Sequence, residues 1–392
     1  MTQRPFLTRN LLLLGLASLF TDLSSHIVFP LVPLFVTGVL GAGSVAVGLI
    51  EGAAETVSAL LKGWAGKWSD RVARRQPFVV AGYVLSTAVK FLFVIANTWP
   101  LVLLARATER IGKGLRSAPR DALIMDECTP QTRGRAYGFQ RAMDGAGGLL
   151  GAIAAWFLLG FLEFREIFLW AIVPGALGAL MAMLVREHPA PALQSGVAAT
   201  APRVRPRFRD LPLPLRRAIE GCTLFALAQF GIAFLLLAAT AQGLDDRDAI
   251  LFYVMFNATN TVASMPAGRL SDRYGRKPVL LGGYALFALA CAMLLAGPGL
   301  VWLLFAFLLY GAAMAAIDGT QRALVADLAP PELRATAMGA YHCAIALVAL
   351  PGGYVAGMLW QHLAPAATFA FGALLALLAI RVLMRLPESR PA

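Results

Sequence analysis

Long uninterrupted apolar runs constrain this chain more than any other feature of its sequence. LLLLGLASLF (residues 11–20) and LLFAFLLYGAAMAA (residues 303–316) are two examples. Runs of about 20 apolar residues match the hydrocarbon thickness of a bilayer, where backbone polar groups must be satisfied inside a helix or a closed barrel. Barrel strands would alternate apolar and polar residues, and these runs do not. Because 58% of the residues are hydrophobic, more than a soluble core would bury, we expect an all-α polytopic membrane protein.

The apolar runs predict twelve transmembrane helices in two groups of six. Their ranges are 11–38, 46–65, 77–97, 99–122, 136–160, 166–185, 221–242, 249–267, 278–296, 299–325, 336–359 and 366–384. A stretch rich in proline, alanine and arginine separates the two groups. We therefore expect an N-terminal six-helix bundle at residues 1–185, a cytoplasmic linker at 186–220 and a C-terminal six-helix bundle at 221–392.

A hydrophilic loop occurs twice, as GKWSDRVARR (residues 66–75) and GRLSDRYGRK (residues 268–277), with an offset of 268 − 66 = 202 residues. The repeated residues are Gly66, Asp70, Arg71, Arg74 and Arg75 in the first copy and Gly268, Asp272, Arg273, Arg276 and Lys277 in the second. A second pair of loops, ALIMDECTPQTRGRA (122–136) and ALVADLAPPELRATA (323–337), repeats at an offset of 327 − 126 = 201. Two separate loops at nearly one offset indicate a duplicated chain.

The basic residues of the short loops predict how the helices are oriented in the membrane. Loops after the second, fourth, sixth, eighth and tenth predicted helices carry arginine or lysine, whereas the opposite loops carry only Arg165 and Arg247. Because cytoplasmic loops are enriched in basic residues, we expect both termini in the cytoplasm. The net charge of +12 therefore marks orientation, and no nucleic-acid partner is expected.

These motifs resemble those of the major facilitator superfamily, over essentially the whole chain. The second loop fits the superfamily signature at every defining position, including Gly275, whereas the first has Ala73 and Trp68 at two of those positions. RIGKGLRSA (110–118) resembles the superfamily's Arg-x-x-Gln-Gly pattern, with Lys113 in place of glutamine. The resemblance implies two pseudo-symmetric six-helix bundles around a central cavity, working by alternating access.

The resemblance also implies that the two repeated loops form a gate. Asp70 and Asp272 would make ion pairs with basic residues between the bundles in one conformation and lose them in the other. The alternative is that the basic residues of these loops only enforce orientation through the positive-inside bias.

Ionisable residues within the predicted spans are concentrated in the first half, and each is a functional candidate because burial in lipid is costly. Arg106, Arg110, Lys113, Arg116 and Arg120 recur at helical intervals and form a basic stripe that should face the cavity or its mouth. Such a stripe suits an anionic group. The candidates for the substrate cavity are His26, Arg106, Arg110, Lys113, Arg116, Asp144 and Asp318.

The candidates for proton coupling are Asp22, Glu51 and Glu55. Desolvation raises the pKa of a carboxyl group and an adjacent cation lowers it, so a change of partner between states can load and release a proton. We expect Arg110 as the partner of Asp22, since both lie in cavity-lining spans of the resembled fold. The alternative is that acids and bases neutralise one another and hold the first bundle together. For Glu109, Arg141 and Asp144 we favour such structural pairing.

Other chemistries find little support in the sequence. The chain has no Gly-x-x-x-x-Gly-Lys-Ser/Thr loop for nucleotide binding, and His26, His188, His342 and His362 have no metal-site spacing. Adjacent Ser24, Ser25 and His26 point in different directions on a helix, so we expect no enzyme. The four cysteines, Cys128, Cys222, Cys291 and Cys343, are interpreted as helix-packing residues without a metal or disulfide framework.

The leading hypothesis is a monomeric, multi-pass transporter of the plasma (bacterial inner) membrane. It would use the proton gradient, without a cofactor, to export a small amphipathic organic compound of anionic character. The first alternative is a proton-linked importer or facilitator of an organic anion or metabolite. An alternative of another class is a non-transporting membrane sensor or a lipid scramblase on the same fold.

Overall fold

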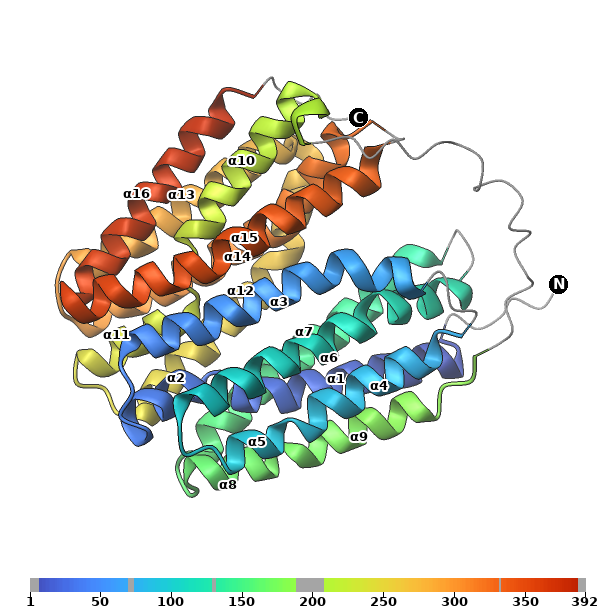
Figure 1. Cartoon of the computed structure of the whole chain (residues 1–392), viewed down its shortest axis with the longest axis horizontal. Helices are drawn as coiled ribbons and strands as arrows, with labels where there is room; N and C mark the ends of the chain where they lie inside the picture. Colours follow the sequence, from blue (N-terminus) through green and yellow to red (C-terminus); the bar gives the residue numbers. More distant parts are fainter. Residues whose placement is uncertain (1–6, 70–73, 129–131, 188–207, 331–332, 387–392) are drawn as a thin grey trace.

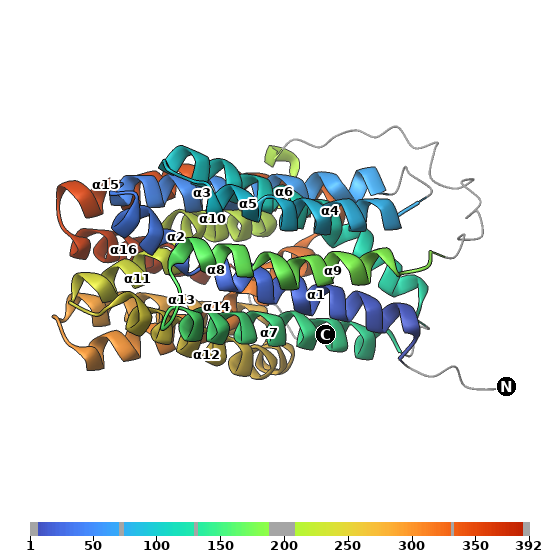
Figure 2. The same ribbon diagram turned by 90° about the horizontal axis from the view of Figure 1, so that it is seen from below.

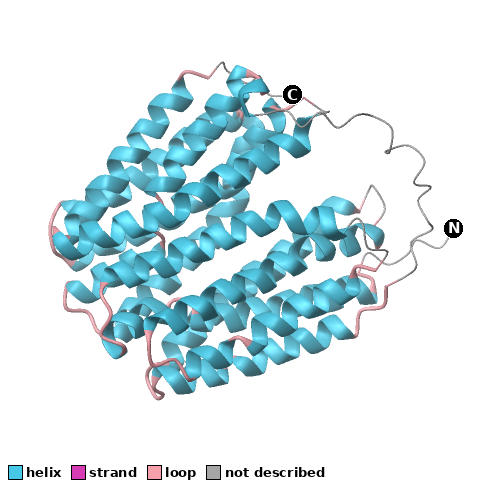
Figure 3. Ribbon diagram, in the orientation of Figure 1, coloured by secondary structure: helices cyan, strands magenta, loops and turns pink. Residues whose placement is uncertain are grey.

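The computed structural model describes residues 7–69, 74–128, 132–187, 208–330 and 333–386, and in this part of the chain all regular structure is helical (Figure 3). The first half contains α1 (Arg9–Val28), α2 (Leu31–Leu34), the π-helical turn η1 (Phe35–Val39), α3 (Ser44–Ser69), α4 (Gln76–Ala88), α5 (Lys90–Val94), α6 (Trp99–Asp126), α7 (Arg133–Leu158), α8 (Phe164–Trp170) and α9 (Ile172–Met183). The second half contains the 3-10 turn η2 (Phe208–Asp210), α10 (Leu213–Ala228), α11 (Ile232–Ala241), α12 (Asp246–Tyr274), α13 (Arg276–Leu295), α14 (Leu300–Leu328), α15 (Arg334–His362) and α16 (Pro365–Met384).

The two halves form separate bundles of roughly parallel and antiparallel rods, with α3 and α15 side by side between them (Figure 1). Figure 2 shows the second long contact between the halves, where α7 lies against α12. The bundles meet at the N-terminal end of α3 and diverge toward its C-terminal end (Figure 1). The arrangement therefore joins the halves at one end of the rods.

By length and apolar composition, nine helical segments of the described chain could cross a membrane. They correspond to nine of the twelve predicted spans. The other three predicted spans, 99–122, 136–160 and 249–267, lie in the long helices α6, α7 and α12, which carry more polar and charged residues. The all-α class is confirmed, and the count of twelve membrane spans stays a prediction.

Several helices extend well beyond the apolar runs that predicted them. α10 begins at Leu213, inside the predicted linker 186–220, and its first turns include Arg216 and Arg217. α12 likewise continues past residue 267 to Tyr274. Hydropathy reports where a helix leaves apolar surroundings, whereas backbone hydrogen bonding continues until a cap or a breaker ends it. The helix ends are therefore not at the positions that the apolar runs predict.

Two helices break at matching places in the two halves. The first break follows Phe29, where Pro30 lacks a backbone N–H. The second lies between α10 and α11, where Gly231 adopts a φ of +78° that disfavours other residues. Interrupted helices leave backbone polar groups that are tolerated only where they are buried in protein or line a cavity. Both breaks lie on the central cavity described below.

The duplication is visible in the hydrogen bonds as well as in the sequence. Arg75 Nη1 lies 2.7 Å from Asp126 Oδ2, and the side chain of Arg276, 276 − 75 = 201 residues later, reaches Asp327 at 3.2 Å. The next residue repeats the correspondence. Gln76 donates to the carbonyl oxygen of Val185 at 3.0 Å, and Lys277 donates to that of Leu386 at 2.5 Å. Equivalent side chains thus fasten equivalent helices in each half.

Glycines allow α3 and α15 to approach closely where the halves meet. A Cβ on Gly48 would lie 2.0 Å from the carbonyl oxygen of Gly353, so no side chain fits there. Side-chain hydrogen bonds extend the contact in both directions, from Ser44 to the Gly357 carbonyl at 3.1 Å and from Thr56 to the Ala346 carbonyl at 3.0 Å. This backbone-to-backbone contact closes one end of the interface.

Candidate functional site

A central cavity of about 460 Å³ lies between the two halves. The first half contributes polar and charged groups to its wall, including Glu51, Glu55, Arg110 and Arg141. The broken segment of the second half, Gln229–Ile232, forms another part of the wall. Pockets of this size hold small organic ligands in other proteins. The cavity is thus a candidate substrate site formed jointly by the duplicated halves.

A smaller side pocket of about 120 Å³ opens between α1 and α6. Its lining consists of Ser25, His26, Phe29, Arg106, Glu109, Arg110, Lys113 and Arg116. His26, Phe29 and Arg110 also line the central cavity, so the two spaces adjoin. Four members of the predicted basic stripe therefore face this pocket, namely Arg106, Arg110, Lys113 and Arg116, and of these Arg110 alone also lines the central cavity. The fifth predicted member, Arg120, lines neither space.

Buried ions of alternating sign connect the interior of the first half to the central cavity. Lys90 Nζ lies 3.9 Å from Glu109 Oε1, and Glu109 Oε2 lies 2.6 Å from Arg106 Nη1. Arg106 Nε in turn lies 3.7 Å from Glu51 Oε1, on the cavity wall. Lys90 is fully buried and Arg106 is only 2% exposed. Glu109 therefore has the structural pairing that the sequence favours.

Asp22 pairs with Lys113 at 3.9 Å and not with Arg110, its expected partner. The two basic residues are three apart on α6, and only the packing of α1 against α6 decides which one the carboxylate meets. Asp22 is partly buried, whereas the side chain of Lys113 is 48% exposed. The pair therefore joins the protein interior to the edge of the side pocket.

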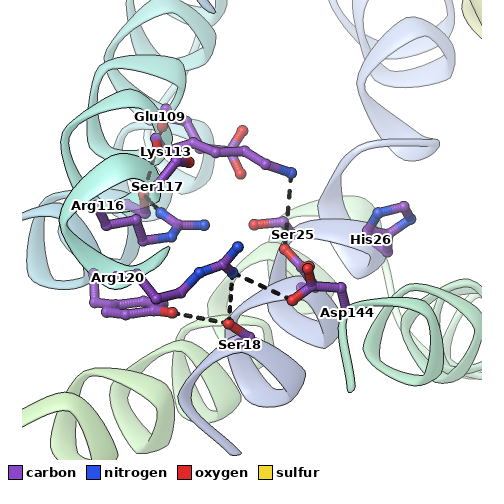
Figure 4. Close-up of polar contacts among 12 residues, drawn as sticks. Ser18, Ser25, His26, Glu109, Lys113, Arg116, Ser117, Arg120 and Asp144 are labelled. Carbon is purple, nitrogen blue, oxygen red and sulfur yellow. Dashed lines mark hydrogen bonds and ion pairs between the residues drawn. The ribbon is translucent and has the colours of Figure 1, made fainter. Parts of the chain in front are cut away.

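Asp144 belongs to a polar cluster beside this pocket rather than to the cavity wall (Figure 4). Arg120 Nη1 lies 3.3 Å from Asp144 and donates to Ser18 Oγ at 2.8 Å. Gln140 donates to the same two residues, at 2.9 Å and 2.6 Å. The predicted structural pairing of Asp144 is thus found. Arg141, for which we also expect pairing, is instead exposed and lines the central cavity.

His26 connects the two halves at the junction of the two cavities. Its Nδ1 atom lies 2.9 Å from the Tyr253 hydroxyl on α12. Glycines on α7 make room for this side chain, since a Cβ on Gly148 would lie 3.3 Å from His26 Cε1 and one on Gly151 would lie 2.8 Å from His26 Cβ. Asp318 and His342 of the second half also line the central cavity, as the sequence predicts for Asp318.

Aromatic residues of the second half form a wall that the analysis of charges misses. Phe230, Tyr253, Phe256, Tyr310 and Tyr341 line the central cavity. Duplication gives these positions counterparts in the first half: Tyr310 corresponds to Glu109 at an offset of 310 − 109 = 201. Most of the rings on the cavity wall therefore come from the second half, although Phe29 comes from the first, and charged side chains come from both halves. Aligning the two halves of the sequence at this offset would have shown an aromatic residue opposite a buried charged residue, and this is the signal that the sequence offers.

The described members of the repeated loop pair within their own halves. Arg276 Nη1, at the start of α13, lies 2.5 Å from Asp272 Oδ1 in the last turn of α12. Gly275 separates the two helices with a φ of +93°. Gly66 lies in α3 and Arg74 is exposed, whereas Asp70 and Arg71 lie outside the described residues. Ion pairs between the bundles at this gate stay a prediction for another conformation.

The cysteines differ in how far they are buried. Cys222 and Cys291 are buried as expected of packing residues, whereas Cys343 is exposed. The described part of the chain contains no cluster of three or more His, Cys, Asp and Glu side chains arranged to hold a metal ion.

The sequence is similar to those of membrane transporters. The Major Facilitator Superfamily model matches residues 14–255 and 219–392. An uncharacterized MFS-type transporter of Methanocaldococcus jannaschii is 36% identical over 383 residues, which cover 95% of this chain and 93% of that protein. The multidrug resistance protein MdtH of Yersinia enterocolitica is 33% identical over 144 residues, which cover 36% of each chain.

The fold is similar to that of a solved nucleoside transporter, NupG. The TM-score is 0.81 at 14% sequence identity, over 96% of this chain and 100% of the other. At so low an identity the likeness concerns the fold alone.

Proposed function

Because this chain belongs to the major facilitator superfamily, we propose that it is a proton-coupled secondary transporter that exports a small amphipathic organic anion. The observation that carries the anionic part is the basic stripe of α6, which faces a pocket adjoining the cavity between the halves. Arg110, on both walls, would bind the anionic group in the low-dielectric interior, where charge-assisted hydrogen bonds are strong. A neutral cargo would bring no negative charge to Arg110.

The coupling mechanism that we propose uses the carboxylates near this stripe. Glu51 has Arg106 within 3.7 Å, and Asp22 has Lys113 within 3.9 Å. When the halves rock, a carboxylate that loses its cation takes up a proton, and it releases the proton when the cation returns. Glu55, exposed in the central cavity, is the third candidate.

We further propose twelve spans in the plasma membrane, both termini in the cytoplasm, a monomeric state and no cofactor. On that topology the halves are closed at the outer end by α3 and α15, so the cavity belongs to an inward-open state. The partial similarity to a multidrug resistance protein supports export over import. A proton-linked importer, the alternative, would use the same cavity and differ only in the direction of net substrate flux.

Reconstitution into vesicles with an imposed pH gradient tests this proposal. We expect gradient-driven movement of small organic anions from a panel of aryl and alkyl carboxylates. Asp22→Asn, Glu51→Gln and Glu55→Gln each remove one candidate carrier, and the true carrier's variant should keep anion exchange but lose gradient-driven flux. Net flux in both gradient orientations distinguishes export from import. Movement of lipid between leaflets without movement of any anion would reject the transporter in favour of a scramblase.

A further inference from the structure

The side pocket contains buried hydrogen-bond donors without partners. Among the described residues, Nη2 of Arg106 and Nε of Arg110 are buried atoms with no hydrogen-bond acceptor. Arg106 is only 2% exposed, and both side chains line the pocket. Buried polar groups in native proteins are nearly always satisfied, so such donors one helical turn apart indicate a missing acceptor.

The neighbouring carboxylates do not accept hydrogen bonds from these donor atoms. Glu109 accepts from Arg106 through Nη1, at 2.6 Å, and not through the unpartnered Nη2. The nearest oxygen of Glu51 is 3.7 Å from Arg106 Nε, beyond hydrogen-bonding distance. A planar or tetrahedral oxyanion has several acceptor atoms and fits the fork of donors on a guanidinium group.

A continuous series of rings leads from this pocket into the central cavity. Phe29, on the wall of both spaces, has its ring centroid 6.0 Å from that of Tyr253. Tyr253 is 5.9 Å from Phe256, and Phe256 is 5.6 Å from Tyr310. All four rings line the central cavity, where Phe29 and Phe256 are only partly buried. An aromatic ligand would extend this series at the centroid spacing that ring pairs prefer.

We propose that the side pocket and the ring series form one two-part site for an aryl oxyanion. Arg106 and Arg110 bind the oxyanion in the side pocket, and the aromatic body lies against Phe29 and Phe256 in the central cavity. This inference rests on the proposed function, which it narrows from an amphipathic anion to an aromatic one. It also gives the halves different shares in recognition, since the arginines that bind the oxyanion come from the first half and the rings come from both halves, Phe29 from the first and Phe256 from the second.

Equilibrium binding to the purified full-length protein in detergent tests this inference without any ion gradient. The probes are 2-naphthoate, its neutral amide 2-naphthamide, and the saturated acid decahydro-2-naphthoate, titrated by calorimetry. We expect 2-naphthoate to bind at least about tenfold more tightly than either analogue, about 1.4 kcal/mol. Equal affinity for acid and amide would overturn the oxyanion subsite. Equal affinity for the aromatic and saturated acids would overturn the ring subsite and point to an aliphatic or lipid-like anion.

Two matched variants locate the subsite. Arg110→Gln removes a charge shared by both spaces and should reduce the preference for 2-naphthoate over the amide at least about fivefold. Arg141→Gln removes a charge of the central cavity alone and should leave most of that preference in place. Lys113→Gln, at an exposed position of the side pocket, is expected to reduce the preference and guards against misfolding of the Arg110 variant. Loss of the preference in Arg141→Gln but not in Arg110→Gln would overturn the assignment. Because no transport is measured, selective binding would survive a failure of proton coupling, and vesicle transport without selective binding would reject the two-part site alone.

Discussion

The Tyr253 hydroxyl and His26 Nδ1 lie 2.9 Å apart across the interface between the two halves. The contact joins α1 to α12 at the junction of the central cavity and the side pocket. It therefore joins the two halves directly at the wall of the candidate substrate site. Loss of this contact would remove a direct hydrogen bond between α1 and α12.

We predict that Tyr253→Phe destabilises this conformation by about 1 kcal/mol, the usual net value of one hydrogen bond. The ring is kept, so its packing against Phe29 and Phe256 is unchanged. Thermal unfolding in detergent measures the effect as a lower midpoint. Tyr274→Phe, on an exposed ring of the same helix, is the control and should leave the midpoint where it is. Equal shifts in the two variants would show that the interface contact contributes nothing.

The glycine contact between α3 and α15 closes one end of the interface, and we predict that one added methyl group opens it. Gly353→Ala would place a Cβ 2.2 Å from the Gly48 carbonyl oxygen, so the helices must separate. We expect a cysteine at Gln229, exposed in the cavity, to become reactive toward an impermeant maleimide added outside, in a background without native cysteines. Gly339→Ala is the control, because a Cβ on Gly339 of the same helix meets nothing within 4 Å. Protection of the Gln229 cysteine from the maleimide in both variants would contradict the role of the α3–α15 contact in closing this end of the cavity.

The buried ion pairs of the first half should be far more sensitive to substitution than the exposed pair at its end. Glu109→Gln leaves Arg106 and Lys90 without their shared carboxylate, which costs about 3–5 kcal/mol for a buried charge. Asp126→Asn removes the partner of Arg75 near the surface and should cost less than about 1 kcal/mol. Thermal unfolding of both variants compares them directly.

A double variant checks the cause of that loss. In Glu109→Gln, Lys90 and Arg106 both lose the Glu109 carboxylate. Adding Lys90→Met removes one of these two buried cations, so part of the lost free energy of unfolding should return. Strictly additive destabilisation by the two substitutions would mean that Lys90 and Glu109 are not coupled.

If the repeated loops form a gate, substitutions of their carboxylates should reduce transport without impairing folding or membrane insertion. Asp70→Asn, and Asp272→Asn in the second copy, should strongly reduce gradient-driven flux in vesicles while membrane insertion stays normal. The physical reason is that each carboxylate can exchange partners between conformations, as Asp272 now pairs with Arg276. Asp248→Asn, an exposed residue at the opposite end of α12, is the control. Full transport activity of Asp70→Asn would reject the gating role.

Much of the architecture could be predicted from the sequence because hydropathy and duplication act over long stretches of chain. The apolar runs give the helical class, and the offset of about 201 residues is repeated in the pairs Arg75–Asp126 and Arg276–Asp327. Helix ends were less predictable, since α10 begins at Leu213 within the predicted linker. Polar caps and helix extensions outside the lipid leave no mark in a hydropathy pattern.

The candidate site was predictable only in part. Helical spacing placed Arg106, Arg110, Lys113 and Arg116 on one face of α6, and this face does line a pocket. Spacing could not tell that Asp22 meets Lys113 rather than Arg110, nor that Arg141 turns into the central cavity. Those outcomes depend on the rotation and offset of neighbouring helices, which a single helix does not encode.

By itself, the sequence determined that the chain forms apolar helices in two related halves, with nearly all buried charge in the first. These properties follow from composition and periodicity, which are local. Only the tertiary structure decided that Phe29 and Tyr253, from different halves, belong to one series of rings beside two arginines that each keep a buried donor atom without a partner. Aromatic residues in an apolar run look alike in sequence whether they face lipid, core or cavity, and only packing of the halves separates these three environments.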